Sequence, residues 1–315
     1  MPQPITSKYL IHSLVVESSI NLTPLEPIDC LNSHSKEADI KVVLIGNDQE
    51  EVNHFSGTQA STNNCWIDIE EIAIFHIQNG NTIEIKPHPN APEQSILLYL
   101  FGSIMAVCLY QRGLLVLHAN AIEIGGTAVL LAGDSGVGKS TTAAIFHQKG
   151  FNVLSDDIVV VNTDAKAMGG FPQIKLFQST LDQLNISSKN LTPISAQKGK
   201  FSFPLTQKHN QNKRTISAIY ILSTANEKVS KDFILSPING IQRFKNLIKN
   251  TYRNELIDGL NIKDQHLTLC AHLSKKIHLM SIVRPESYFN GHELVDTILT
   301  DLNSNNICTT TNTLK

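Results

Sequence analysis

A glycine-rich segment near the middle of the chain has the residue types and spacing of a polyphosphate-binding loop. Residues 133–140 read GDSGVGKS, which fits the P-loop pattern GxxxxGK followed by Ser or Thr. In such a loop, successive backbone N–H groups surround the phosphates, and the N-terminus of the following helix adds positive potential. We expect Lys139 to reach the β- and γ-phosphates of ATP and the Ser140 hydroxyl to bind Mg²⁺. The predicted nucleotide-binding residues are Gly133, Asp134, Ser135, Gly136, Val137, Gly138, Lys139, Ser140 and Thr141.

A pair of acidic residues, Asp156 and Asp157, follows Lys139 by seventeen and eighteen positions within the apolar run NVLSDDIVVV. Adjacent carboxylates in an apolar strand are costly unless cations satisfy them. A regular strand directs neighbouring side chains to opposite faces, so one acid would face the phosphates and metal and the other an acceptor or a supporting partner. The alternative is a strand that ends at Ser155, with both acids solvated in a turn.

A histidine, His118, lies just upstream in LLVLHANAIEI, on the strand that is predicted to precede the P-loop strand. Two interpretations stay open for it. It is either a core histidine or a partner that orients and tunes one of the two aspartates.

Residues 114–161 resemble the catalytic domain of bacterial HPr kinase/phosphorylase and the wider family of HPr-kinase-like serine kinases. The family pattern of a histidine, GDSGxGKS and a DD pair after a small residue falls on His118, residues 133–140 and Asp156-Asp157. Thr141 stands where HPr kinases usually carry an acidic residue. Further stretches are similar to the kinase-related branch found near peptide-modification operons: GFPQIKLF at 170–177, KGKFSFPL at 198–205, and residues 235–260.

The resemblance implies an ATP- and Mg²⁺-dependent kinase that phosphorylates a serine-type hydroxyl. It implies Asp156 as the base, tuned by His118, and Asp157 with Ser140 as the metal ligands. The acceptor stays open between a ribosomal peptide or protein, such as a lasso-peptide precursor, and free serine or another small metabolite. A nucleotide-binding regulatory protein without turnover is the alternative from another class, and a homo-oligomer stays open.

Other P-loop classes lack their signatures in this chain. The LSGGQ motif of ABC ATPases and the DxxG and NKxD motifs of GTPases are absent, and five arginines are few for the lid of an adenylate-type kinase. The transferring phosphoryl group nevertheless needs a cation. Lys198, Lys200 and Arg253 are the candidates, and solvated surface charge is the alternative for each.

The sequence predicts an α/β P-loop kinase domain over residues 93–302, a β-rich unit over residues 1–92 and a disordered tail over residues 303–315. The runs TAVLLA and STTAAIFHQKG place the glycine-rich loop between a strand and a helix, as a P-loop requires. Asn79-Gly80 between alternating runs predicts a hairpin, and Ser236-Pro237 predicts a helix start. Residues 47–64 are polar and predict a loop.

The apolar segment 96–110 is shorter than the roughly 20 residues that cross a bilayer, so we expect a buried core helix and no membrane partner. The N-terminal strands 72–77 and 82–85 either offer an edge to a peptide acceptor or complete the core against this helix.

Composition excludes several classes of protein. Hydrophobic residues make up 41% and charged residues 17%, which excludes a disordered polyelectrolyte. The net charge of −2 gives no field for binding nucleic acid. The five cysteines have no CxxC spacing, and the N-terminus has no basic-then-apolar signal pattern, so we expect a reducing cytoplasm.

Overall fold

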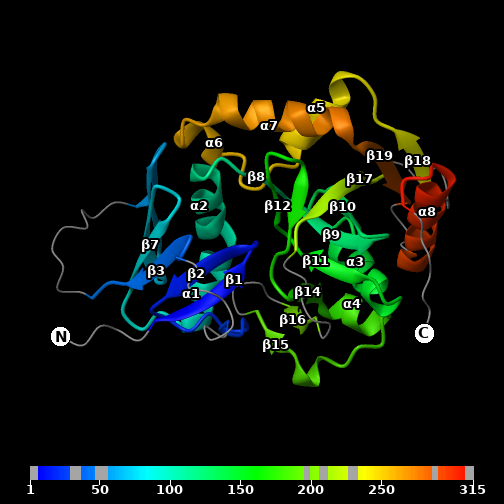
Figure 1. The fold of residues 1–315 in the computed structure, drawn as a ribbon. Coiled ribbons are helices and arrows are strands. Elements are labelled where there is room, and N and C mark those ends of the chain that lie inside the picture. Colours follow the sequence, from blue (N-terminus) through cyan, green and yellow to red (C-terminus); the bar gives the residue numbers. More distant parts are fainter. Residues whose placement is uncertain are drawn as a thin grey trace. The chain divides into compact units, whose positions relative to one another are not determined.

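The computed structural model describes residues 6–28, 37–46, 56–194, 199–205, 212–225, 233–285 and 290–308. The chain divides into two compact units (Figure 1). Unit 1 comprises Met1–Val116 and Arg253–Leu267, and unit 2 comprises Leu117–Tyr252 and Thr268–Lys315. This division differs from the predicted boundary at residue 92, because the apolar helix after that residue and a later segment of the chain both pack within unit 1.

Unit 1 is built on a seven-stranded sheet in the order β1-β2-β3-β7-β6-β5-β4. The hairpin at Asn79-Gly80 is confirmed: both residues have positive φ, 51° and 63°, and they join β6 to β7. A second tight turn, His12-Ser13, joins β1 to β2. The strands are β1 Ser7–Ile11, β2 Leu14–Ser18, β3 Ile40–Leu44, β4 Gly57–Ser61, β5 Asn64–Ile69, β6 Ala73–Gln78 and β7 Thr82–Pro87.

Of the two alternatives for strands 72–77 and 82–85, a free edge for a peptide acceptor is wrong. Strand β6 pairs with β5 and β7, and strand β7 pairs with β6 and β3, so neither strand has a free edge. The prediction of a loop over 47–64 is also wrong in part, since β4 lies within it; residues 47–55 lie outside the described residues. Strand β4 is polar and largely exposed, and among the described strands it pairs with β5 alone. It lacks the apolar alternation that would have predicted a strand.

The apolar segment after the sheet forms a continuous helical stretch. It consists of α1 Glu93–Tyr99, a wider π-helical turn η1 Leu100–Ile104 and α2 Met105–Gln111, with a local departure from helical geometry at Gly102. Glu93–Gln111 is the one helix in the described part of the chain that is long and apolar enough to cross a membrane, and 67% of its most apolar window is buried. Helix α2 contacts β6, and Gln111 accepts a hydrogen bond from the Gly80 amide at 2.8 Å. The helix is therefore a core helix of unit 1.

We expect a truncated protein that starts at residue 92 to aggregate. The truncation removes the sheet against which α2 packs and exposes side chains such as Leu100, Ile104 and Val107, which have no solvent exposure in the whole chain. Size-exclusion chromatography of the truncated protein checks this. A control that starts at residue 6 keeps every described strand and should stay soluble. A soluble, ATP-binding truncated protein would show that the sheet of unit 1 is dispensable for the fold.

Unit 2 contains a mixed sheet that carries the P-loop strand at its centre. Strand β17 pairs in parallel with β10 on one side and β19 on the other, whereas β9 lies antiparallel to β10. The order runs β11-β9-β10-β17-β13-β12-β8, and β18 extends from β19. Its strands are β8 Leu115–Leu117, β9 Ala119–Ile124, β10 Thr127–Gly133, β11 Asn152–Ser155, β12 Val159–Val161, β13 Lys166–Met168, β17 Arg214–Thr224, β18 Ile234–Pro237 and β19 His278–Arg284.

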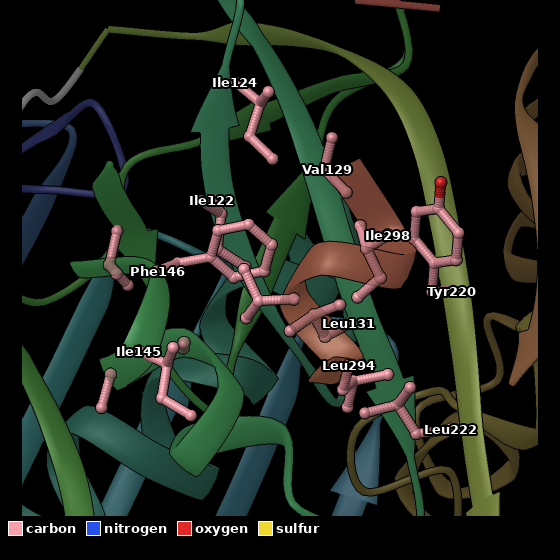
Figure 2. Close-up of a cluster of buried hydrophobic side chains, with 14 of the residues drawn as sticks. Ile122, Ile124, Val129, Leu131, Ile145, Phe146, Tyr220, Leu222, Leu294 and Ile298 are labelled. Atoms are coloured by element: carbon pink, nitrogen blue, oxygen red, sulfur yellow. The ribbon is translucent and has the colours of Figure 1, made fainter. Parts of the chain in front are cut away.

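The core of unit 2 lies between this sheet and two helices, α3 Lys139–Gln148 and α8 Gly291–Ser304 (Figure 2). Phe146 of α3 and Ile298 of α8 are fully buried against β9 and β10 residues such as Ile122 and Leu131. A separate three-stranded sheet, in the order β14-β16-β15, comprises β14 Gln173–Phe177, β15 Thr192–Pro193 and β16 Lys200–Pro204. The remaining helices are α4 Gln178–Gln183, η2 Ser188–Asn190, α5 Ile241–Lys249, α6 Leu256–Gly259 and α7 Lys263–Lys276, which spans the division between the units.

Two predictions for unit 2 are corrected. Ser236-Pro237 does not open a helix but ends β18, which pairs with β19 alone among the strands that the structure describes. Proline is tolerated at such an edge, and α5 starts at Ile241 after Gly240. The predicted disordered tail is ordered at its start, because Cys308 is 5% exposed and its Sγ lies 3.1 Å from Thr127 Oγ1. Residues 309–315 lie outside the described residues.

Candidate functional site

The P-loop connects the end of β10 to the start of α3. Gly133 has φ 137°, and a Cβ at this position would collide with the Leu222 carbonyl of β17, so only glycine fits there. Gly136 and Gly138 also have positive φ, 84° and 106°. The chain can therefore turn sharply and direct backbone N–H groups into the loop, as a phosphate site requires.

Contacts from β19 and α5 hold the loop from outside. Arg284 Nε donates a hydrogen bond to the Val137 carbonyl at 3.1 Å, and burial lowers the pKa of this arginine. Lys249 Nζ lies 3.3 Å from Asp134 Oδ2 in an exposed ion pair. Asp134, Ser135 and Gly136 are themselves exposed, so the tip of the loop is accessible to a ligand.

The P-loop lysine is folded back onto its own loop. Lys139 Nζ donates to the carbonyls of Gly133 and Asp134 at 2.7 and 3.0 Å and lies 3.1 Å from His118 Nε2. Burial lowers the pKa of Lys139, although the charges of Asp157 and Asp156 oppose that shift. The ammonium group is thus held between the loop carbonyls and His118.

The acidic pair lies in a bend. The prediction that both aspartates lie on a regular strand is therefore wrong. Strand β11 ends at Ser155 and β12 resumes at Val159, and Asp157 has a φ of 71°. Ser155 Oγ donates to the Ile158 carbonyl across the bend, which stabilises it. The alternative is therefore correct in placing the strand end at Ser155 and wrong in making both acids solvated, since both aspartates are half-buried and hydrogen-bonded.

Asp156 accepts hydrogen bonds from three elements. Its Oδ1 lies 2.9 Å from Ser140 Oγ and 2.8 Å from Asn120 Nδ2, and its Oδ2 accepts from the Lys175 backbone amide at 2.9 Å. Burial and the neighbouring charge of Asp157 raise the pKa of Asp156, and these hydrogen bonds oppose the shift. The carboxylate is therefore fixed against the P-loop serine.

Asp157 contacts a histidine and a lysine, and not the P-loop serine. Its Oδ1 lies 3.2 Å from His118 Nδ1, and its Oδ2 lies 3.3 Å from Lys175 Nζ. Burial alone would raise the pKa of Asp157, but the hydrogen bond from His118 and the charge of Lys175 hold it well below the usual range. Asp157 is therefore ionised at neutral pH.

His118 connects this carboxylate to the P-loop lysine. Because Nδ1 faces the Asp157 carboxylate and backbone carbonyl, it carries the proton, and Nε2 then accepts from Lys139. The ring of Tyr252 lies 6.0 Å from the His118 ring. The structure thus places His118 in the site rather than in the core.

Two residues of this site, Lys175 and Asn120, were not predicted from the sequence. Asn120 donates to Asp156 and accepts from the Asp157 amide at 3.3 Å. It stands two positions after His118, so strand alternation would have placed both side chains on one face. Lys175 lies between apolar neighbours in QIKLF, and a lysine at such a position needs an acidic partner.

The structure differs in what it shows of the three candidate cations, Lys200, Lys198 and Arg253. Lys200 begins β16, where its Nζ lies 4.7 Å from the centre of the exposed Phe177 ring, and its charge contributes to the lowered pKa of Lys139. Lys198 lies outside the described residues. Arg253 belongs to unit 1, where its guanidinium donates to Ser103 Oγ at 3.1 Å and pairs with Glu255.

The donor set fits Mg²⁺ bound together with a nucleotide. Among the described residues, no group of three or more His, Cys, Asp or Glu side chains could hold a metal ion by itself. Magnesium commonly takes one or two carboxylates and completes its shell with phosphates and water. Ser140 Oγ and Asp156 Oδ1, 2.9 Å apart at the start of α3, provide such a partial set.

Comparisons with known proteins match the part of the sequence that contains the site. The family model of the HPr Serine kinase C-terminal domain matches residues 114–182. HPr kinase/phosphorylase of Caldanaerobacter subterraneus is 36% identical over 62 residues, which are 19% of this chain and 20% of that protein. HPr kinase/phosphorylase of Limosilactobacillus reuteri is 42% identical over 60 residues, 18% of this chain and 19% of that protein.

A solved structure, the Hpr(Ser) kinase/phosphatase from Coxiella burnetii, is similar with a TM-score of 0.31 and 12% sequence identity, over 61% of this chain and 90% of that chain. The sequence matches span about a fifth of the length of these curated relatives. The matched segment nevertheless contains the P-loop, His118, the aspartate pair and Lys175. Residues 114–182 are thus similar in sequence to the C-terminal domain of HPr Serine kinases.

Proposed function

We propose that this protein is an ATP-dependent kinase that phosphorylates a serine-type hydroxyl on a peptide or protein. The observation that carries the proposal is the position of Asp157, an ionised carboxylate connected through His118 to the P-loop lysine. A kinase must bring a nucleophile-binding carboxylate and a phosphate-binding cation together. A protein that only bound a nucleotide would have no use for this second acid.

The P-loop residues bind and orient the phosphates. Lys139 exchanges its contacts with the loop carbonyls for the β- and γ-phosphates, and the backbone N–H groups at the start of α3 stabilise the same charge. When bound, Mg²⁺ would neutralise the negative charge that develops on the transferring phosphoryl group. The acceptor oxygen forms a bond to the γ-phosphorus while the bond from that phosphorus to the β–γ bridging oxygen breaks.

The contacts of the two aspartates favour the reverse of the roles that the family resemblance implied. In P-loop enzymes, the P-loop serine and a nearby aspartate hold Mg²⁺. Here Asp156 contacts Ser140, so we assign the metal role to Asp156. Asp157 then accepts the proton of the acceptor hydroxyl. Because phosphoryl transfer depends mainly on positioning and charge, a carboxylate of low pKa can serve in this role.

A polypeptide acceptor is proposed from the names of the relatives, which are kinases of the protein HPr. A degenerate library of serine-containing peptides and free serine, each incubated with γ-labelled ATP and Mg²⁺, tests this choice. We expect label on a subset of the peptides and none on free serine. Label on free serine alone would assign the small-metabolite alternative.

We expect Lys200→Ala to raise the KM of the acceptor or lower kcat while ATP affinity changes little. Lys200 lies at the start of β16 over the exposed Phe177 ring, outside the P-loop itself. Steady-state kinetics with varied acceptor, together with a nucleotide titration, checks this prediction. Weaker ATP binding with an unchanged acceptor KM would show that Lys200 is a nucleotide contact.

A further inference from the structure

Lys175, the central residue of β14, contacts both aspartates of the site through different atoms. Its backbone amide donates to Asp156 Oδ2 at 2.9 Å, and its Nζ lies 3.3 Å from Asp157 Oδ2. The neighbouring residues Ile174 and Leu176 are buried in the core of unit 2, which fixes the strand. A single residue of the small sheet therefore contacts both carboxylates.

The pairing register of β14 explains why this amide is available. In an antiparallel pair, alternate residues direct their N–H groups toward the partner strand. The residues beyond each end of β14 follow this pattern, since the Gln178 amide donates to Gly199 and the Pro172 carbonyl accepts from Leu205. Lys175 has the opposite phase, so its amide points away from β16 and toward Asp156.

The ammonium group of Lys175 has a role that Lys139 cannot fill during phosphoryl transfer. In the structure, Lys139 and Lys175 together offset the charges of Asp156 and Asp157. When Lys139 turns to the phosphates, Lys175 stays in contact with both aspartates. Its side chain is 18% exposed, so water screens this interaction only in part.

We propose that Lys175 is a positioning residue for phosphoryl transfer: its ammonium group holds Asp157 toward His118 and the acceptor hydroxyl, and its amide holds Asp156 toward Ser140. The inference rests on the proposed function and adds a residue to it. The two contacts are separable by mutation, because a side-chain substitution removes the first and keeps the second.

The test compares Lys175→Met, Lys175→Arg and the matched control Lys166→Met. Lys166 is a half-buried strand lysine of unit 2 whose side chain forms no ion pair among the described residues. For Lys175→Met we expect kcat to fall by about 10²-fold, the cost of misplacing a reacting group by about 1 Å, with Mg²⁺ and nucleotide affinities unchanged. Lys175→Arg keeps the charge, so its kcat should be at least about tenfold higher than that of Lys175→Met. Lys166→Met should have the kcat of the wild type.

A double variant keeps the test valid if Lys175→Met alone does not fold. Lys175→Met combined with Asp157→Asn removes both charges of the Lys175–Asp157 ion pair together, so neither is left without the other. If Lys175 acts through Asp157, the double variant should transfer at the rate of Asp157→Asn alone, within about twofold.

Three results would overturn the inference: an unchanged kcat in folded Lys175→Met, a loss of Mg²⁺ affinity equal to the loss of kcat, or a further loss of about tenfold in the double variant. A wild-type protein that binds ATP and phosphorylates no acceptor would overturn the proposed function, and this inference with it.

Discussion

Lys139→Ala should transfer no measurable phosphoryl group and should bind ATP more weakly. The substitution removes the cation that lies between the loop carbonyls and His118, where it is ready to meet the β- and γ-phosphates. Loss of one such electrostatic group typically costs about 10²–10³ in kcat. Here the loss should be at least that large, because Lys139 is the lysine of the P-loop itself.

A matched control for this variant lies at the other end of the same region. Lys149 follows α3 and pairs with Asp296 on the surface, so Lys149→Ala makes the same chemical change away from the loop. Steady-state kinetics and a nucleotide titration should separate the two variants clearly. Turnover of Lys139→Ala equal to that of Lys149→Ala would contradict the assignment of the P-loop.

Asp157→Asn should lower transfer by about 10²–10⁴-fold, the usual contribution of a general base. The amide is nearly the same size as the carboxylate, and its one oxygen can still accept from His118 or from Lys175, so fold and nucleotide binding should be nearly intact. Asp156→Asn should instead weaken Mg²⁺ binding, because Asp156 is the carboxylate next to Ser140. Single-turnover rates measured over a range of Mg²⁺ concentrations distinguish the two effects.

The control for these variants is Asp164→Asn, which lies in an exposed turn and should behave as the wild type. If Asp156→Asn loses only the rate and Asp157→Asn loses Mg²⁺ binding, the two roles are as the family resemblance first implied. If neither variant changes the rate, the acidic pair is structural.

Features that depend on neighbouring residues could be predicted from the sequence. The hairpin at Asn79-Gly80 needs only two residues that tolerate positive φ between alternating strands. The P-loop needs glycines, a preceding strand and a following helix, all within about twenty residues of sequence. The helix Glu93–Gln111 follows from one apolar run.

Features that depend on residues distant in the chain could not be predicted from the sequence. The bend at Asp156-Asp157 is set by contacts with Asn120, Ser140 and Lys175, which belong to three different elements. Helix Glu93–Gln111 belongs with the N-terminal sheet because of packing that its own sequence does not specify. Ser236-Pro237 has the composition of a helix start, but pairing with β19 places it in a strand.

The most direct test of the account is a transfer assay with the full chain, γ-labelled ATP, Mg²⁺ and the serine peptide library, in which wild type and Asp157→Asn are compared at equal nucleotide occupancy. We predict label on the serine hydroxyl with the wild-type protein and a rate lower by about 10²–10⁴-fold with Asp157→Asn. Equal labelling by both proteins, or ATP binding by the wild type without label on any acceptor, would contradict it.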